Sequence, residues 1–279
     1  MEYRILAGDC IARMQMMDKN SVDDIITDPP YEINMMGHGW DNSGIAYNPH
    51  TWKAAHRVLK PNGLLVVFGA TRTHHRIAHA IERAGFEIVE IIAWTYSTGF
   101  PKNHNIGKVI EKKTGSKSDQ WEGWGTALKP AWEPIIIARK KGSKRTVKNI
   151  SKFIHAVKAS KKERNRGLEG MEKRENEHST WGVDSDKGLI HKGRNPENRT
   201  RLQENFHPTV KPVKLMKILV DEYSEKGGTV FDPFVGSGTT GMACVLSDRN
   251  FIGCELTEDY LPLIRARIEA VKADKEGWI

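Results

Sequence analysis

The stretch Phe231-Asp232-Pro233-Phe234-Val235-Gly236-Ser237-Gly238-Thr239-Thr240-Gly241 joins the end of an apolar strand to a glycine-rich turn and the start of a helix. Glycines 236, 238 and 241 have the GxGxxG spacing, which permits a tight turn and lets a ligand approach the backbone. Free N–H groups at the start of the helix attract negative charge. Glu255 ends the next expected strand, where a carboxylate can accept hydrogen bonds from ribose hydroxyls. The stretch therefore predicts a nucleotide-like ligand.

The late position of this stretch decides the order of the fold. Only 24 residues follow Glu255, too few for the rest of a sheet, so the other strands must come from the N-terminal part. Taken alone, the glycine turn fits a nicotinamide dehydrogenase as well as an S-adenosylmethionine enzyme. Dehydrogenases normally carry the turn after their first strand, so its late position weakens that interpretation.

Apolar strands and helical segments alternate along the rest of the chain. Near-continuous Val, Ile and Leu runs are typical of a parallel sheet buried on both faces. We therefore expect an α/β protein with a permuted, Rossmann-like, mostly parallel sheet and helices on both faces. The expected strands are 3–6, 22–27, 64–68, 86–94, 133–138, 229–232 and 250–255, and the expected helices are 11–17, 49–59, 72–84, 212–223, 239–246 and 258–272.

The positive charge of the chain is concentrated in one segment. Residues 139–201 hold 19 Lys and Arg against 8 Asp and Glu, a net charge of +11, whereas the whole chain has a formal charge of +8. The segment also has few aliphatic residues, in contrast with the periodic sequence on either side. It has the character of an insertion. Composition alone leaves open a solvated loop and an element that binds a polyanion.

Composition excludes several classes of protein. The chain has 279 residues, of which 38% are hydrophobic and 28% charged, which suits a folded enzyme and neither a fibrous nor a disordered protein. No apolar run approaches the ~18 residues of a membrane helix, and the first residues lack the pattern of a secretory signal. Cys10, Cys244 and Cys254 have no CxxC spacing, which favours free thiols in a reducing compartment. We expect a cytoplasmic protein without membrane contact.

A second motif, Asp28-Pro29-Pro30-Tyr31, follows the expected strand 22–27. The carboxyl ends of strands in an open α/β sheet are where ligands bind. Two prolines keep the backbone extended and leave carbonyls free, so Asp28 and the Pro29 carbonyl can accept both hydrogens of one amino group. Tyr31 can stack on the ring that bears this group. A rigid turn with an Asp cap and a packed Tyr is the plainer alternative.

Together these motifs resemble the beta-class amino DNA methyltransferases, in which the catalytic motif precedes the target-recognition region and the glycine loop comes last. The resemblance rests on Asp28-Pro29-Pro30-Tyr31, on the stretch from Asp232 to Thr240, and on His207-Pro208-Thr209-Val210-Lys211-Pro212. It covers nearly the whole chain apart from the basic insertion. Segments 99–102 and 123–134 are similar to those of phage and bacterial members that modify adenine.

The resemblance implies a role for each matching residue. Asp28, Pro29, Pro30 and Tyr31 would form the catalytic motif, and Asp232, Phe234, Gly236, Ser237, Gly238 and Thr239 would hold S-adenosylmethionine. Glu255 would bind the ribose, and the segment of Asp9 and Cys10 would meet the adenine of the cofactor. Thr209 and Lys211 would meet its methionine carboxylate. Lys211 is chemically suited to that contact, because an ammonium offers three donors.

The expected activity is methyl transfer to the N6 amine of adenine in double-stranded DNA, with base flipping and without a metal. Cytosine N4 methylation and a catalytically silent DNA-binding module are the alternatives. The expected divisions are 1–139 for the catalytic half, 140–206 for target recognition and 207–279 for cofactor binding. A homodimer and a cognate restriction endonuclease are the further partners that the resemblance suggests, in a prokaryotic or phage-infected cell.

Two other patterns are set aside. His75 and His79 lie one helical turn apart beside His74, but no Cys or carboxylate completes a ligand set nearby. Trp121, Trp124 and Trp132 could stack on bases, yet tryptophan more often packs in cores or interfaces, so packing is the expectation for them.

Overall fold

Eight strands form one sheet in the order β1-β12-β11-β2-β3-β5-β4-β6. This order is seen in a computed structural model that describes residues 1–33, 39–97, 105–117, 119–125, 130–147, 153–175, 182–184, 188–190 and 202–278. Five neighbouring strands, from β1 to β3, run parallel, and β5 is antiparallel to both β3 and β4. The strands are β1 (Tyr3–Ala7), β2 (Asp24–Thr27), β3 (Leu64–Phe68), β4 (Phe86–Thr95), β5 (Trp132–Lys140), β6 (Phe153–His155), β11 (Thr229–Asp232) and β12 (Asn250–Glu255).

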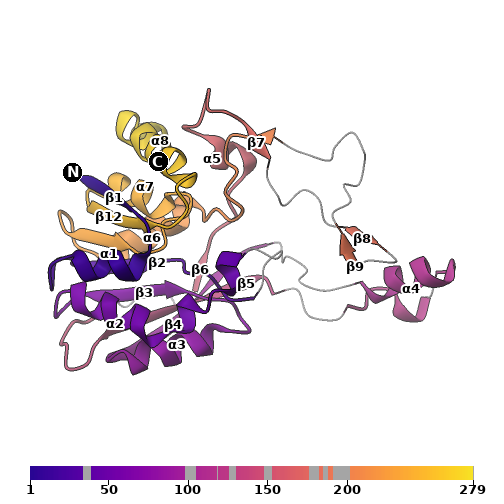
Figure 1. The fold of residues 1–279 in the computed structure, drawn as a ribbon, viewed down its shortest axis with the longest axis horizontal. Helices are drawn as coiled ribbons and strands as arrows, with labels where there is room; N and C mark the ends of the chain where they lie inside the picture. Colours follow the sequence, from indigo (N-terminus) through magenta and orange to yellow (C-terminus); the bar gives the residue numbers. More distant parts are fainter. Residues whose placement is uncertain are drawn as a thin grey trace.

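Helices cover both faces of this sheet (Figure 1). One layer contains α1 (Cys10–Met16), α2 (Pro49–Val58) and α3 (His74–Arg83), and the other contains α6 (Val213–Tyr223), α7 (Thr239–Leu246) and α8 (Tyr260–Ala273). Each layer buries its own apolar cluster against the sheet. The strands serve both clusters, as β3 shows, since all five of its residues are buried. The sequence of a strand buried on both faces is continuously apolar for this reason.

The α/β class, the permuted order and the helices on both faces are confirmed. Strands 64–68, 229–232 and 250–255 and helix 239–246 have the expected bounds. The expected strand 22–27 begins only at Asp24, because Val22 makes an isolated bridge with Leu59 instead. The helix expected to start at residue 72 begins at His74.

The expected insertion is partly built into the sheet and the helical layers. Its β6 pairs with β4 and extends the main sheet. The short helix α5 (Lys161–Asn165) lies beside the start of α6, where Glu163 accepts the Val213 N–H at 2.7 Å. The Arg164 guanidinium donates to the His207 carbonyl at 2.8 Å. Two small ribbons follow, β7 (Arg174–Glu175) with β10 (Leu202–Gln203), and β8 (Gly182–Asp184) with β9 (Gly188–Ile190). The proposed boundaries at 140 and 206 remain a prediction.

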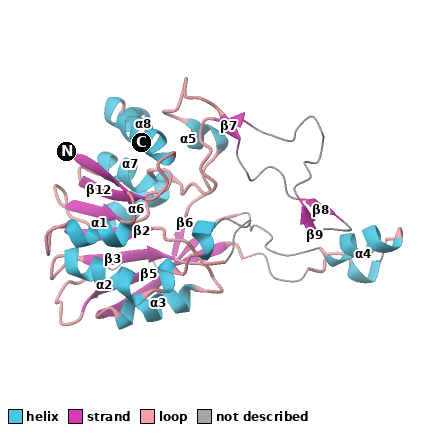
Figure 2. Cartoon of the chain, viewed as in Figure 1, coloured by secondary structure: helices cyan, strands magenta, loops and turns pink. Residues whose placement is uncertain are grey.

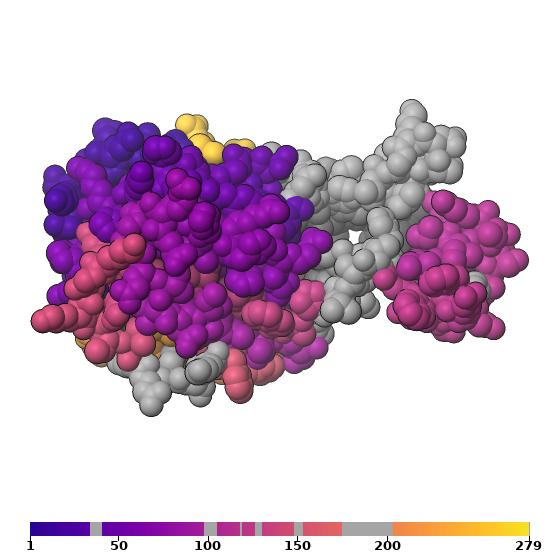
Figure 3. All heavy atoms as spheres, turned by 90° about the horizontal axis from the view of Figure 1, so that it is seen from below, coloured from indigo at the N-terminus to yellow at the C-terminus, as the bar shows by residue number. Residues whose placement is uncertain are grey.

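Residues 105–125 form a small unit away from the main body, built on α4 (Ile106–Thr114) (Figures 1 and 3). Asn105 caps the helix through the Lys108 N–H, and Trp121 contacts Trp124 edge to face. Trp124 and Trp132 are 60% and 39% exposed, so neither packs in the core, and the expectation that they pack in an interface remains a prediction. Segments 99–102 and 126–129, which the resemblance also used, lie outside the described residues.

Loops join most of these elements at the edges of the sheet (Figure 2). The carboxyl ends of β2, β11 and β12 meet at one such edge, and the residues that follow them carry both motifs found in the sequence. Within the described ranges, no helix is long and apolar enough to cross a lipid bilayer.

Candidate active site

The site lies where the strand order of the sheet reverses, between β11 and β2. The chain leaves β11 toward α7 and leaves β2 toward the opposite layer, so a crevice opens at the carboxyl ends of these strands. Asp232 ends β11 and Asp28 directly follows β2. The Thr27 hydroxyl donates to Asp232 Oδ1 at 2.6 Å and joins the two strand ends. The catalytic motif and the glycine loop therefore face one crevice.

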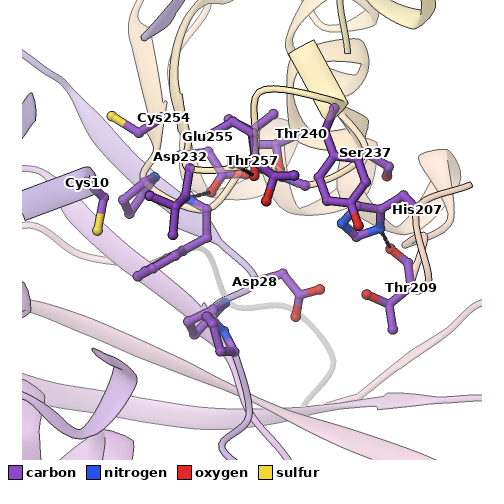
Figure 4. Close-up of a pocket in the computed structure, with 18 of the residues that line it drawn as sticks. Cys10, Asp28, His207, Thr209, Asp232, Ser237, Thr240, Cys254, Glu255 and Thr257 are labelled. Carbon is purple, nitrogen blue, oxygen red and sulfur yellow. Dashed lines mark hydrogen bonds between the residues drawn. The ribbon is translucent and has the colours of Figure 1, made fainter. Parts of the chain in front are cut away.

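A pocket of about 250 Å³ occupies this crevice (Figure 4). Fourteen of the fifteen residues predicted for the site line it, and Gly238 is the exception. The lining residues among the predictions are Asp9, Cys10, Asp28, Pro29, Pro30, Tyr31, Thr209, Lys211, Asp232, Phe234, Gly236, Ser237, Thr239 and Glu255.

The glycine loop has the backbone that its sequence predicts. Gly236 and Gly238 have φ of +55° and +82°, in the region that glycine adopts without steric penalty. A Cβ at Gly236 would lie 2.9 Å from His207 Nε2, so a side chain there would collide with the pocket wall. Gly238 instead packs against Ile264 of α8 and forms the turn behind the pocket. Gly238 therefore shapes the loop without lining the cavity.

Two buried carboxylates hold the loop in place. Asp232 accepts hydrogen bonds from Thr27, from the Phe234 N–H at 2.9 Å and from the Thr240 hydroxyl at 2.6 Å. Burial raises the pKa of Asp232 to about 6, against the effect of these donors. Glu255 accepts the N–H groups of Gly236 and Thr257, each at 2.8 Å, and burial raises its pKa. The carboxylate predicted to bind a ribose thus also fixes the turn.

The N-terminal wall of the pocket comes from the turn between β1 and α1. Asp9 caps α1 by accepting the Ala12 N–H at 2.9 Å. Cys10 is 6% exposed, and burial, followed by the nearby Asp9 carboxylate, raises the pKa of its thiol to about 12. Cys10 is therefore a neutral, weakly reactive wall residue at neutral pH.

Lys211 connects the catalytic motif to a second carboxylate. Its Nζ lies 2.6 Å from Asp28 Oδ2 and 3.5 Å from Glu133 Oε2. Burial alone would lower the pKa of Lys211, but these two carboxylates outweigh burial and raise it. Burial raises the pKa of Asp28, and the Lys211 ammonium opposes that rise. The predicted contact of Lys211 with a ligand carboxylate stays a prediction, and here the ammonium binds Asp28 instead.

Asp28 keeps one acceptor free. Its Oδ1 is buried and has no hydrogen-bond partner among the residues described. Buried polar atoms nearly always have partners, so an orphan acceptor in a pocket indicates where a donor of a ligand would bind. The Tyr31 hydroxyl donates to Glu133 Oε2 at 2.7 Å, which fixes its ring beside Asp28. That the Asp28 carboxylate and the Pro29 carbonyl together receive an amino group remains a prediction of the motif.

Several lining or supporting residues were not among the predicted site residues. His207 and Tyr260 contact each other edge to face, with ring centroids 4.7 Å apart, and both line the pocket. Glu133 supports Tyr31 from β5, although 102 residues separate them. His207 and Glu133 lie in segments that the resemblance includes, but no spacing signal marks their roles. The other unpredicted lining residues are Gly8, Asp41, Ser43, Ile45, Met216, Pro233, Val235, Thr240, Cys254, Leu256 and Thr257.

The described part of the chain holds no cluster of three or more His, Cys, Asp or Glu that could bind a metal ion. His75 and His79 are exposed on α3, and His74 Nδ1 lies 3.2 Å from the Ala70 carbonyl. The pocket instead combines five carboxylates with the turn of a glycine loop.

Comparison with known proteins assigns the chain to a family. A family model described as a DNA methylase matches residues 22–266, which include the catalytic motif, the basic insertion and the glycine loop. The chain belongs to the N6/N4 DNA methylase family. This membership confirms the expected class of amino-DNA methyltransferase, with DNA as the substrate, and it supports S-adenosylmethionine as the methyl donor.

Known N6/N4 DNA methylases match over most of their length. The type II methyltransferase M.HindIII of Haemophilus influenzae is 27% identical, over 90% of each chain. The crystal structure of the M1.HpyAVI–SAM complex has a TM-score of 0.57 and 24% identity, covering 95% of this chain and 98% of that one. The cytosine-N4-specific PvuII DNA methyltransferase has a TM-score of 0.64 and 16% identity, covering 96% and 86%. The two solved structures show the same fold.

Proposed function

We propose that the protein transfers a methyl group from S-adenosylmethionine to the N6 amine of adenine in DNA. The observation that carries this proposal is the Asp28 carboxylate, which lines the same pocket as the glycine loop and has one oxygen, Oδ1, without a hydrogen-bond partner among the residues described. An acceptor placed there suits an exocyclic amine. The Asp that precedes the two prolines favours adenine by resemblance.

The charge of the pocket fits this cofactor. Asp9, Asp28, Asp232 and Glu255 line it, and Lys211 is already paired with Asp28. S-adenosylmethionine carries a sulfonium and an ammonium against one carboxylate, so a carboxylate-rich pocket attracts it. A nicotinamide dinucleotide carries negative phosphates, which these carboxylates would repel. The residues present therefore suit the sulfonium cofactor and disfavour the dehydrogenase alternative.

When bound, S-adenosylmethionine supplies an electrophilic methyl group on a positively charged sulfur. The amine of adenine is a poor nucleophile because its lone pair is delocalised into the ring. Hydrogen bonds from the amine to Asp28 Oδ1 and the Pro29 carbonyl favour a pyramidal nitrogen and free this lone pair. As the nitrogen–carbon bond forms and the carbon–sulfur bond breaks, positive charge develops on the amine, and the Asp28 carboxylate would stabilise it. The amine would then release one of its two protons to this carboxylate or to water, which leaves the methylated nitrogen neutral. Tyr31 would stack on the base, which must first leave the duplex.

The decisive test compares Asp28→Ala and Asp28→Asn with the wild-type protein. Labelled S-adenosylmethionine, DNA and protein are incubated, and the DNA is digested to nucleosides and separated. We expect N6-methyladenine from the wild type and a loss of at least ~10²-fold in rate from either variant, because the charge that stabilises the transition state is gone. Cofactor binding, followed by calorimetry, should persist. Turnover by Asp28→Ala at the wild-type rate refutes the assignment of Asp28.

Cytosine N4 methylation is the second candidate, because its exocyclic amine needs the same acceptors and the PvuII enzyme shares the fold. The same nucleoside digest separates the two, since N4-methylcytosine would replace N6-methyladenine.

A cognate endonuclease is a further prediction, supported by the type II methyltransferases among the relatives. A homodimer and a cytoplasmic location are also predictions, and sedimentation of the purified protein tests the first.

A further inference from the structure

A fully buried arginine lies directly behind the glycine loop. Arg267 of α8 has 0% exposure, and its Nη1 donates to the Ser237 carbonyl at 2.6 Å and to Thr239 Oγ1 at 3.3 Å. Ser237 and Thr239 line the pocket, whereas Arg267 does not. The guanidinium therefore contacts the loop from the side opposite the ligand.

Packing alone does not explain this arginine. Its Nε and Nη2 are buried and have no hydrogen-bond partner within the described ranges. Burial lowers its pKa to about 10, so it remains charged at neutral pH. A buried charge with unused donors is unfavourable compared with an apolar side chain of similar volume. Its contribution must lie in what the charge does to its neighbours.

The neighbours form a short chain of hydroxyl groups. Ser237 Oγ and Thr239 Oγ1 are 3.1 Å apart, and either can be the donor of the bond between them. The two hydroxyls have two hydrogens, of which their mutual bond uses one. Arg267 donates to Thr239 Oγ1, so the arginine occupies one of the lone pairs with which this hydroxyl oxygen can accept a hydrogen bond. One hydroxyl hydrogen of the pair is left over for a ligand in the pocket, and Arg267, by occupying a lone pair of Thr239 Oγ1, limits the directions in which the Thr239 hydroxyl can point.

An anionic acceptor is the ligand group that this arrangement suits. Lys211, which lines the pocket, is held by Asp28 and Glu133. We propose that Arg267 is a positioning residue that makes the Ser237–Thr239 pair a donor to the carboxylate of the cofactor's amino-acid end. The proposal rests on the proposed function, because it takes S-adenosylmethionine as the ligand.

The test separates the carboxylate from the rest of the ligand. Dissociation constants are measured by calorimetry for S-adenosylhomocysteine and for its decarboxylated analogue, S-adenosyl-3-thiopropylamine. The wild type should bind the carboxylate-bearing ligand about tenfold more tightly than the analogue. This is the ratio of dissociation constants expected from one charge-assisted hydrogen bond. In Arg267→Met this preference should fall to about threefold or less, while the affinity for the analogue stays within about twofold. Arg267→Lys, which retains the charge, should recover part of the preference.

A matched control is Arg249→Met, which removes another buried arginine. Arg249 is 4% exposed and binds Ser224 and Ser247 beyond the C-terminal end of α7, away from the pocket. It should destabilise the fold without changing the ligand preference. If Arg267→Met fails to fold, Thr239→Val breaks the hydroxyl pair instead and should give the same loss.

The outcomes distinguish this inference from the proposed function. An equal loss of affinity for both ligands in Arg267→Met, or an unchanged preference, overturns the role of Arg267. A wild type that binds both ligands without preference also overturns it, although the cofactor class stands. A wild type that binds neither ligand overturns the proposed function itself, and the role of Arg267 with it.

Discussion

At the scale of single residues, the two oxygens of the Asp28 carboxylate differ in their partners. Oδ2 is bound by Lys211, whereas Oδ1 has no partner among the described residues and is the oxygen that we propose as the acceptor of the substrate amine. The ammonium of Lys211 also lies 4.9 Å from the ring centroid of Phe68 and 5.1 Å from that of Tyr31. Aromatic faces attract cations, so the lysine is held in this position by rings as well as carboxylates.

This arrangement predicts how the activity depends on pH. Asp28 must be ionised to accept the amine, and burial raises its pKa, so activity should fall on the acid side at a pH above the ordinary carboxyl value of about 3.9. In Lys211→Met the opposing ammonium is gone, so the pKa of Asp28 should rise further and the acid limb of kcat should move to higher pH. Profiles are measured at saturating cofactor.

Lys217→Met is the control for this shift. Lys217 lies on α6, six residues beyond Lys211 in the sequence, and pairs with Asp221 at 2.7 Å. Its loss changes the net charge equally but should leave the acid limb in place. If the acid limb of the kcat profile of Lys211→Met stays in place or moves toward lower pH, the pairing of Lys211 with Asp28 is contradicted. The KM for the cofactor in Lys211→Met separately tests the predicted contact with the methionine carboxylate.

A second buried carboxylate predicts how stability depends on pH. Asp24 is 1% exposed and accepts the Leu64 N–H at 2.8 Å, and burial raises its pKa from 3.8 to about 6. Its contribution to stability is therefore full below pH 3.8 and is lost as the pH rises through 6. Asp24→Asn keeps an acceptor for Leu64 and removes the charge.

Relative to the wild type, Asp24→Asn should gain stability between pH 4 and pH 7, by up to about 3 kcal/mol in the free energy of unfolding. Urea unfolding at the two pH values measures the gain. Asp24→Ala, which also leaves the Leu64 N–H unpaired, should be destabilised at both. The same difference between Asp24→Asn and wild type at both pH values argues against a raised pKa.

At the scale of elements, the approach of α7 to the sheet depends on one glycine. A Cβ at Gly241 would lie 2.6 Å from Ile268 Cδ1 and 2.8 Å from Phe251 Cε1. Alanine normally favours a helix over glycine by about 1 kcal/mol, but overpacking costs about 1–3 kcal/mol. We therefore expect Gly241→Ala to lower stability in thermal unfolding. Adding Ile268→Val, which removes one of the clashing atoms, should restore part of the loss. A more stable single variant contradicts this packing.

The elements that could be predicted from sequence are those with a buried face. The apolar runs of β3 and β11 and the buried face of α8 are visible in the residues themselves. In contrast, α4 buries no residue, and the five-residue α5 owes its position to Glu163 and Arg164 contacts with residues about 45 positions away. The partner of Asp28 could not be foreseen either, because 183 residues separate it from Lys211.

At the scale of the whole molecule, the positive charge of residues 139–201 suits a DNA substrate. Lys161 and Lys162 are exposed on α5. If both contact phosphates, Lys161→Ala/Lys162→Ala should lower the slope of log K against log salt for DNA binding by about 2. Fluorescence anisotropy at several salt concentrations measures this slope. Lys53→Ala on α2, in the opposite helical layer, should leave it unchanged. An unchanged slope in the double variant removes α5 from the DNA interface.

The docking of α5 has a mechanical consequence. Glu163 accepts the first N–H of α6, and Arg164 donates to the main-chain carbonyl of His207. His207 is part of the pocket wall. A displacement of this small helix would therefore reach the wall of the proposed methyl-transfer site through only two hydrogen bonds.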